Sequence, residues 1–210
     1  MLTALIDYDS GNLHSARKAF ERMARETDAG DVIVTRSPED VARADRIVLP
    51  GDGAFPACAA ALQASGCLEA LREAVMERGR PFMGICVGMQ LMAREGTEYE
   101  RTEGLGWIDG RVMAIDAPGL KVPHMGWNDL VLEAADHPVL AGITTGDHAY
   151  FVHSYHMEMG DESQRLAHVA YGGDVTAIVG TGTQIGTQFH PEKSQTTGLR
   201  LIANFLDWRP

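Results

Sequence analysis

An apolar run that leads directly into a glycine-flanked cysteine constrains this chain more than any other feature. The run is Phe82–Ile85, and it overlaps a Gly-x-Cys-x-Gly motif from Gly84 to Gly88. We interpret it as a buried strand, a sharp turn and a helix that continues through Leu91 and Met92. With serine in place of cysteine, this turn would be the nucleophile elbow, in which glycines allow a tight, strained backbone.

Cys86 is the chemically reactive residue of this motif. It is predicted to lie at a helix N-terminus, where the helix dipole stabilises a thiolate and lowers the pKa of the thiol. The alternative is a structural cysteine buried between two packing glycines. One short motif does not decide between these interpretations, so the rest of the chain has to.

Strands and helices alternate along the first half of the chain. Short runs rich in valine, isoleucine and leucine predict strands at Leu2–Ile6, Asp31–Thr35 and Arg46–Leu49. Helical spacing predicts helices from Leu13 onward with Ser10 or Asn12 as cap, over Ser37–Ala44, over Cys67–Arg78 and over Ser194–Trp208, the last with Leu199, Ile202, Ala203 and Leu206 on one stripe. This alternation predicts an α/β fold in three layers, with a mostly parallel central sheet between flanking helices.

The second half reads as richer in strands. Short alternating runs between Gly104 and Leu132 predict a β-rich insertion over one end of the sheet. Further strands are predicted at Tyr150–Tyr155, Leu166–Tyr171, Val175–Val179 and Ile185–Phe189, several of them antiparallel. Because no repeat, linker or low-complexity segment interrupts the pattern, we expect residues 1–210 to form a single domain.

Composition excludes several classes of protein. The chain has 210 residues, a net charge of −11 and no basic footprint, which argues against a nucleic-acid binder. No apolar run approaches the ~20 residues of a membrane span, and the N-terminus has no basic signal-peptide region. The three cysteines are odd in number and form no Cys-x-x-Cys motif. We therefore expect a reduced, cytoplasmic protein without a disulfide framework or a zinc site.

A glycine loop follows the Arg46–Leu49 strand. Its sequence is Pro50-Gly51-Asp52-Gly53, and Pro56 stands where a dinucleotide fingerprint would need its third glycine. The Rossmann interpretation is therefore rejected. Such a loop can still offer backbone N–H groups to an anion, which in a thiol acyl-transfer enzyme would be the tetrahedral oxyanion. The alternative is an ordinary turn.

His190 and Glu192 lie two residues apart on either side of Pro191. In extended backbone, residues at this spacing face the same side, and proline is compatible with that extension. The carboxylate is then able to orient and polarise the imidazole, as in the base-and-orienter half of a catalytic triad with Cys86 as nucleophile. A metal pair at His153 and His156 is not favoured, because no third ligand is evident.

These motifs together resemble the class I (triad) glutamine amidotransferases, and among them the glutaminase subunits of imidazole glycerol phosphate synthase. The resemblance covers essentially the whole chain. It rests on the segments Asp7–Asn12, Pro50–Gly53, Gly84–Gln90, Pro123–Asn128, Tyr150–Tyr155 and Phe189–Ser194. The triad segments are shared by the superfamily, whereas the Pro-His-Met-Gly-Trp-Asn and Phe-Val-His-Ser-Tyr stretches point to this particular family.

The resemblance implies a role for each matching residue. Cys86 would attack the side-chain amide of glutamine, His190 would transfer protons, and Glu192 would hold His190. The oxyanion hole would use the backbone N–H of Val87 and an N–H from Gly51, Asp52 or Gly53, the second donor being misplaced at rest and reoriented on activation. The amino-acid end of the substrate would be held by Gly53, Gln90, Glu98, Ser154 and Tyr155. No cofactor or metal is implied.

The family also implies a partner. Released ammonia would pass to a cyclase subunit, a (β/α)₈ barrel, in a one-to-one heterodimer that makes imidazole glycerol phosphate. Residues expected near this partner are Asn12, Met125, Trp127 and Lys193. The chain departs from the family at two positions, since Asp52 stands where an apolar residue is usual and Asp9 where glycine is common. We expect the Asp52 side chain to point to solvent, the alternative being a part in gating.

Two other functions stay open at this point. One keeps the triad but changes the acceptor, as in relatives that serve pyridoxal phosphate, anthranilate or purine pathways or that hydrolyse γ-glutamyl peptides without a partner. The other is a regulatory or scaffold protein on the same fold. The intact Cys86, His190 and Glu192 argue against the scaffold, and the Pro123–Asn128 stretch argues against another acceptor.

Overall fold

A computed structural model describes residues 1–210, and its centre is an eight-stranded sheet of order β2-β1-β3-β4-β14-β13-β12-β9. The strands that run parallel are β1 (Leu2–Ile6), β2 (Asp31–Thr35), β3 (Arg46–Gly51), β4 (Phe82–Cys86) and β14 (Gln184–Thr187). The antiparallel strands are β13 (Asp174–Thr181), β12 (Arg165–Ala170) and β9 (Val131–Leu132). The predicted α/β class with a mostly parallel sheet is confirmed.

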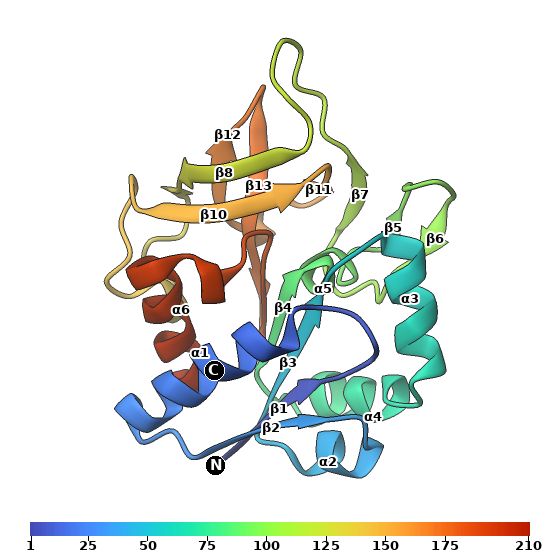
Figure 1. Cartoon of the computed structure of the whole chain (residues 1–210), viewed down its shortest axis with the longest axis vertical. Helices are drawn as coiled ribbons and strands as arrows, with labels where there is room; N and C mark the ends of the chain where they lie inside the picture. Colours follow the sequence, from blue (N-terminus) through green and yellow to red (C-terminus); the bar gives the residue numbers. More distant parts are fainter.

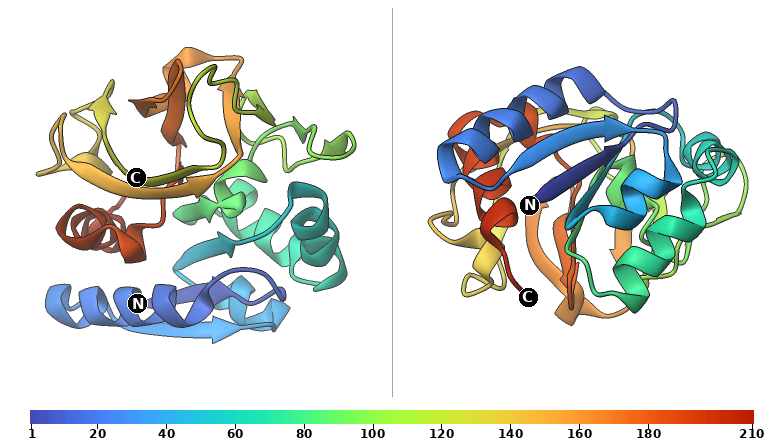
Figure 2. Two further views of the ribbon diagram at one scale, coloured as in Figure 1. Left: turned by 45° about the horizontal axis from the view of Figure 1, so that its top comes forward. Right: turned by 90° about the horizontal axis from the view of Figure 1, so that it is seen from below.

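Helices cover both faces of this sheet (Figures 1 and 2). One face carries α1 (Leu13–Thr27) and α6 (Gln195–Asp207), and the other carries α2 (Pro38–Arg43), α3 (Phe55–Ala64) and α4 (Leu68–Arg72). Right-handed crossovers explain this division, because the chain moves from β1 outward to β2 and then back past β1 to β3. None of the helices is long and apolar enough to cross a bilayer.

Two smaller sheets lie beside the main one. The first pairs β8 (His124–Asp129) with β10 (His148–His153), and the second has the order β11 (Tyr155–Met159), β7 (Gly110–Ala114), β5 (Glu95–Gly96) and β6 (Thr102–Glu103). Figure 1 shows β8 and β10 running across the upper part of the molecule. The predicted insertion therefore supplies strands to both small sheets, although its last strand, β9, joins the large one.

The predicted strand over Tyr150–Tyr155 is wrong in its length, because it is two strands. Up to His153 the chain pairs with β8, and from Tyr155 onward it pairs with β7. Ser154 is the point at which the chain leaves one sheet and enters the other. A pattern of apolar alternation does not reveal such a change of partner.

The helix after β4 is shorter than predicted. Helix α5 covers only Val87–Gln90. Beyond it the carbonyls of Leu91 and Met92 accept hydrogen bonds from backbone N–H groups of residues 105, 107 and 108, which turns the chain toward β6 and β7. Similarly, the predicted helix over Cys67–Arg78 is α4 followed by one π-helical turn, Glu73–Glu77.

Two further differences concern helices. Helix α3 has no predicted counterpart, because a sequence dominated by alanine gives no apolar stripe. In α6, Leu201 and Phe205 are fully buried, whereas the predicted stripe residues Leu199 and Ala203 are only partly buried. The buried face is displaced because α6 packs against α1 as well as the sheet, with Phe205 edge-on to Phe20 at 6.4 Å between ring centroids.

Candidate active site

The carboxyl ends of neighbouring parallel strands form the site. Strands β3, β4 and β14 are neighbours in the sheet, and they end at Gly51, Cys86 and Thr187. His190 follows shortly after the end of β14. Gly51 and Cys86 are register partners. In open α/β sheets this edge is where ligands bind, because loops from separate strands meet there. The glycine loop, the cysteine and the histidine are thus brought together by topology alone.

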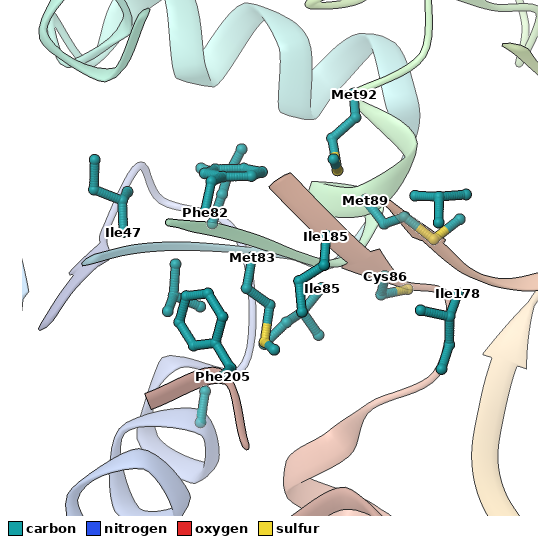
Figure 3. Packing of buried hydrophobic residues seen from close by; sticks show 14 of the residues in the cluster. Ile47, Phe82, Met83, Ile85, Cys86, Met89, Met92, Ile178, Ile185 and Phe205 are labelled. Carbon is teal, nitrogen blue, oxygen red and sulfur yellow. The ribbon is translucent and has the colours of Figure 1, made fainter. Parts of the chain in front are cut away.

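Strain at the elbow is carried by the cysteine itself. Cys86 has φ 54° and ψ −113°, a conformation that L-residues rarely adopt. The two glycines do not have a positive φ, but their lack of a side chain lets backbone segments approach closely. A Cβ on Gly88 would lie 1.8 Å from the Leu49 carbonyl oxygen, and one on Gly84 would lie 2.6 Å from the Gly88 carbonyl oxygen. The glycines thus allow the tight turn, as expected, while the unfavourable φ falls on Cys86. Figure 3 shows Cys86 among the apolar side chains packed around β4.

His190 faces both Cys86 and Glu192. Its Nδ1 lies 2.9 Å from Glu192 Oε1, although the backbone from Pro191 to Lys193 is a 3₁₀ turn and not the extended segment we predicted. The backbone of His190 is held on both sides, since its N–H donates to the Tyr150 carbonyl and its carbonyl accepts from the Ser194 hydroxyl.

The electrostatics of these three groups are interdependent. Burial lowers the pKa of His190, but contacts with the Cys86 sulfur and the Glu192 carboxylate outweigh it and raise the pKa from 6.5 to about 10. At neutral pH the ring is therefore a cation. The second oxygen of Glu192 is buried without a partner in the chain, so this imidazolium is the cation that balances the carboxylate. An imidazolium beside a cysteine sulfur is a common setting for a thiolate nucleophile.

A cavity of about 280 Å³ opens above Cys86. Of the residues predicted for substrate and oxyanion binding, those that line it are Asp52, Gly53, Val87, Gln90, Glu98, Ser154 and Tyr155. Gly51, His190 and Glu192 are not among the lining residues, although His190 contacts Cys86, which is. Three lining residues were not predicted, namely Pro123, Val152 and His153. The cavity is thus narrow, polar on several sides and has a reactive sulfur in its wall.

Two of the predicted substrate residues are already engaged. The amide nitrogen of Gln90 donates to the Tyr155 carbonyl and to Gln188 Oε1, both at 3.0 Å. Gln188 in turn donates to the Cys86 sulfur at 3.7 Å. Glu98 accepts the N–H of Phe55 at 2.8 Å, which caps helix α3 directly after the glycine loop. Gln188 was not predicted, because its role depends on a side-chain contact across 102 residues of sequence.

A serine holds the glycine loop in place. The Asp52 N–H donates to Ser10 Oγ at 3.1 Å, and that hydroxyl donates to the Asp52 carbonyl at 2.8 Å. Cys58 Sγ lies 3.1 Å from the same hydroxyl. In this structure the Asp52 N–H is therefore directed at Ser10 and is not available to an oxyanion. The Asp52 side chain is exposed, as expected.

The residues expected near a partner lie on neighbouring surfaces. Met125 and Trp127, two apart on β8, are 63% and 46% exposed, which is unusual for large apolar side chains. Trp127 and residues 194–197 line one hollow, so Lys193 lies close by. The turn that contains Lys193 packs against α1, whose N-terminus is capped by the Asn12 side chain.

Other cavities and histidines do not form a comparable site. A hollow of about 630 Å³ lies on the small sheets, and no cysteine, serine or histidine lines it. Its three arginines, Arg94, Arg101 and Arg111, are each paired with a carboxylate. No group of three or more histidine, cysteine, aspartate or glutamate side chains has a metal-binding arrangement. All three cysteines are free and buried.

Comparisons with known proteins agree with this geometry. The family model for glutamine amidotransferase class-I matches residues 4–208. The chain is 68% identical to imidazole glycerol phosphate synthase subunit HisH of Cereibacter sphaeroides and 66% identical to that of Ruegeria pomeroyi, each over the full length of both chains. Among solved structures, a glutamine amidotransferase matches with a TM-score of 0.74 at 22% identity over 97% of each chain, which supports the fold alone.

Identity at this level over the whole chain establishes the family. The elbow, the glycine loop and the His190–Glu192 pair occur together within the segment that the family model matches. The chain belongs to the class-I glutamine amidotransferases and, within them, to the imidazole glycerol phosphate synthase HisH subunits.

Proposed function

We propose that this chain hydrolyses L-glutamine to glutamate and ammonia, as the glutaminase subunit of imidazole glycerol phosphate synthase in histidine biosynthesis. The observation that carries the proposal is the arrangement of Cys86, a protonated His190 and a balancing Glu192 beside a cavity of about 280 Å³. A cavity of this size suits an amino acid, and its wall presents the sulfur to a bound side chain.

The proposed chemistry proceeds through a thioester. The Cys86 sulfur attacks the side-chain carbonyl carbon of glutamine, and His190 holds the proton removed from the thiol. Collapse of the tetrahedral intermediate breaks the C–N bond while His190 protonates the leaving nitrogen, so that ammonia departs. Water then attacks the γ-glutamyl thioester, with His190 accepting its proton, and glutamate is released. Glu192 stabilises the imidazolium and orients the ring throughout.

Oxyanion stabilisation is the step at which activity is proposed to be controlled. Val87, directly after the nucleophile, supplies one backbone N–H at the first turn of α5, where such groups lack an intrahelical partner. The second donor is proposed to come from the Gly51–Gly53 loop. Because Ser10 holds the Asp52 N–H, the loop has to rearrange before that N–H can serve the oxyanion.

Replacing Ser10 with alanine tests this restraint. Loss of both hydrogen bonds to the Asp52 peptide should release the loop and raise partner-free glutaminase activity by about three- to tenfold. Initial rates of glutamate release by the isolated chain provide the measurement. Ser15→Ala serves as control, since the Ser15 hydroxyl makes no hydrogen bond in the structure. Unchanged or lower activity in Ser10→Ala would contradict the restraint.

The ammonia acceptor is proposed to be a cyclase subunit, a (β/α)₈ barrel bound one-to-one. The partner surface is proposed to comprise Asn12, Met125, Trp127 and Lys193. An exposed methionine and tryptophan beside a lysine are typical of an interface, because aromatic residues and methionine are enriched there. Lys193 has no carboxylate partner within the chain, which leaves it available for a salt bridge to the cyclase.

Lys193→Ala should weaken coupling to the cyclase. We expect the activation of glutamate release by the liganded partner to fall by about tenfold, because a charge pair at the interface is lost. Thiol reactivity of Cys86 should stay unchanged, since the Lys193 amine takes no part in the triad. Lys18→Ala, which removes an exposed lysine from α1, is the matched control. Equal activation of the Lys193 variant and the parent would remove Lys193 from the interface.

The function itself is tested by glutamate release in three conditions: the chain alone, with the cyclase subunit, and with that subunit and its nucleotide ligand. Low activity alone and a large rise with the liganded partner are expected. Full activity without a partner would indicate a stand-alone γ-glutamyl hydrolase, and activation by a different synthase would reassign the acceptor. No activity in any condition would overturn the glutaminase assignment.

A further inference from the structure

Two buried histidines that the proposed chemistry does not use form a hydrogen-bonded chain to the cavity. His124 on β8 and His153 on β10 are cross-strand partners and are 3% and 6% exposed. His124 Nδ1 lies 2.9 Å from His153 Nε2, and His153 Nδ1 lies 2.8 Å from the Tyr155 carbonyl oxygen. At the outer end, Asn128 Nδ2 lies 3.2 Å from His124 Nε2.

The direction of every hydrogen bond in this chain is fixed from its inner end. The Tyr155 carbonyl can only accept, so His153 Nδ1 must carry a proton. In a neutral ring His153 Nε2 is then an acceptor, and His124 Nδ1 must donate to it. His124 Nε2 is therefore an acceptor too.

The outer end gives the same answer independently. Asn128 Nδ2 also contacts the Ala170 carbonyl at 3.2 Å, which identifies that atom as the amide nitrogen and a donor to His124 Nε2. Two carbonyls at opposite ends, Ala170 and Tyr155, thus require one and the same proton arrangement. Both rings carry their proton on Nδ1, and all the hydrogen bonds run from Asn128 toward the cavity.

Both rings are neutral and rigidly held. Burial lowers the pKa of His124 and lowers that of His153 to about 3. His124 stacks with both Tyr171 and Phe151, whose ring centroids lie 4.0 and 4.9 Å away. The stacking fixes the plane of the His124 ring, and with it the line along which Nδ1 donates.

The series of hydrogen bonds ends at the part of the cavity wall where the backbone passes from one small sheet to the other. Ser154 and Tyr155 both line the cavity with Cys86. The Tyr155 carbonyl accepts from Gln90 as well as from His153, and the Ser154 carbonyl accepts the Ile115 N–H at 2.9 Å. With these acceptors occupied, the wall cannot rotate its peptide groups without breaking a buried hydrogen bond.

We propose that His124, acting through His153, is a positioning residue that holds the Ser154–Tyr155 wall in the geometry that binds glutamine. This inference rests on the proposed function. His124 does not line the cavity and reaches it only through His153. Because His124 shares strand β8 with Met125 and Trp127, the same chain ties the cavity wall to the strand that carries the proposed partner surface.

The proton positions are testable without any variant. Nitrogen-15 NMR of the imidazole rings in the wild-type chain distinguishes Nδ1–H from the commoner Nε2–H tautomer. We expect both His124 and His153 to carry the proton on Nδ1 at neutral pH. An Nε2 proton on either ring would reverse the hydrogen bonds and overturn the proposal.

Two substitutions test the functional consequence in the complex with the cyclase subunit. His124→Phe keeps a stacking ring but loses the donor, so KM for glutamine should rise about tenfold with kcat within about threefold of wild type. His124→Asn can place an amide N–H near the position of Nδ1, and it should recover most of that loss. His156→Phe is the control, because the buried Nδ1 of His156 has no partner in the protein.

The outcomes separate the two ideas. An unchanged KM in His124→Phe, or equal changes in all three variants, would overturn the positioning role while leaving the glutaminase intact. A wild-type complex that released no glutamate would overturn the proposed function instead. The ring tautomers would then still test the direction of the hydrogen bonds through His124 and His153. Should His124→Phe fail to fold, an Nε2 proton on either ring of the wild-type protein would still overturn the proposal.

Discussion

Replacing Cys86 with alanine should abolish glutamate release, by on the order of 10⁵-fold in the complex activated by the cyclase and its ligand. The reason is that the proposed reaction needs a covalent bond to sulfur, and no other thiol lines the cavity. Cys58 and Cys67, the remaining cysteines, are buried elsewhere and absent from the cavity wall. His190 and Glu192 alone can orient water only poorly for attack on an amide.

The assay is glutamate release, followed with labelling by an electrophilic glutamine analogue and mass spectrometry of the modified peptide. Wild-type protein should be labelled at Cys86 and nowhere else. Cys67→Ala is the matched control, since it also removes a buried thiol but one that lies away from the cavity, and it should keep both activity and labelling. Residual turnover above about 1% in Cys86→Ala would contradict the covalent route.

Gly88→Ala should be the most destabilising single-methyl substitution near the site. The added Cβ would lie 1.8 Å from the carbonyl oxygen of Leu49. Leu49 belongs to the buried central strand β3, so its backbone cannot shift without disturbing the sheet. We expect a loss of at least about 3 kcal/mol in the free energy of unfolding. In a chain of this length that corresponds to a fall in melting temperature of roughly 6–12 °C.

Gly173→Ala is the matched control for this substitution. Gly173 has open space where its Cβ would be, and its φ lies outside the left-handed region. Its replacement should therefore change the free energy of unfolding by no more than about 0.5 kcal/mol. Urea denaturation of both variants gives the comparison. Similar midpoints for Gly88→Ala and Gly173→Ala would mean that the elbow and β3 are not locked together as described.

Local pattern was sufficient for the first part of the fold. The strands Leu2–Ile6 and Asp31–Thr35 have the predicted bounds, and Ser37 caps α2 as its sequence indicates. These elements are fully specified by apolar runs bounded by polar or capping residues. Prediction failed where neighbours far away in sequence decide the structure, as at Ser154, where the strand changes sheets, and after Gln90, where carbonyls bind a later loop.

The candidate site divides in the same way. Cys86, His190 and Glu192 were predicted because motif and resemblance mark them. Ser10, Gln188 and His124 act through side-chain hydrogen bonds to partners 42, 102 and 29 residues away, which no spacing rule reveals. The motif also predicted a strained turn, but sequence does not show which residue adopts the unfavourable φ, and in the structure it is Cys86.

The place of β14 in the main sheet has a consequence for the newly made chain. This strand is among the last to leave the ribosome, yet it lies between β4 and β13, in the middle of the sheet. Until it arrives, β4 is an unprotected edge of apolar side chains, which is prone to pair with other chains. The nascent protein thus cannot complete its sheet until about nine-tenths of it has been synthesised, and it stays inactive and aggregation-prone until then.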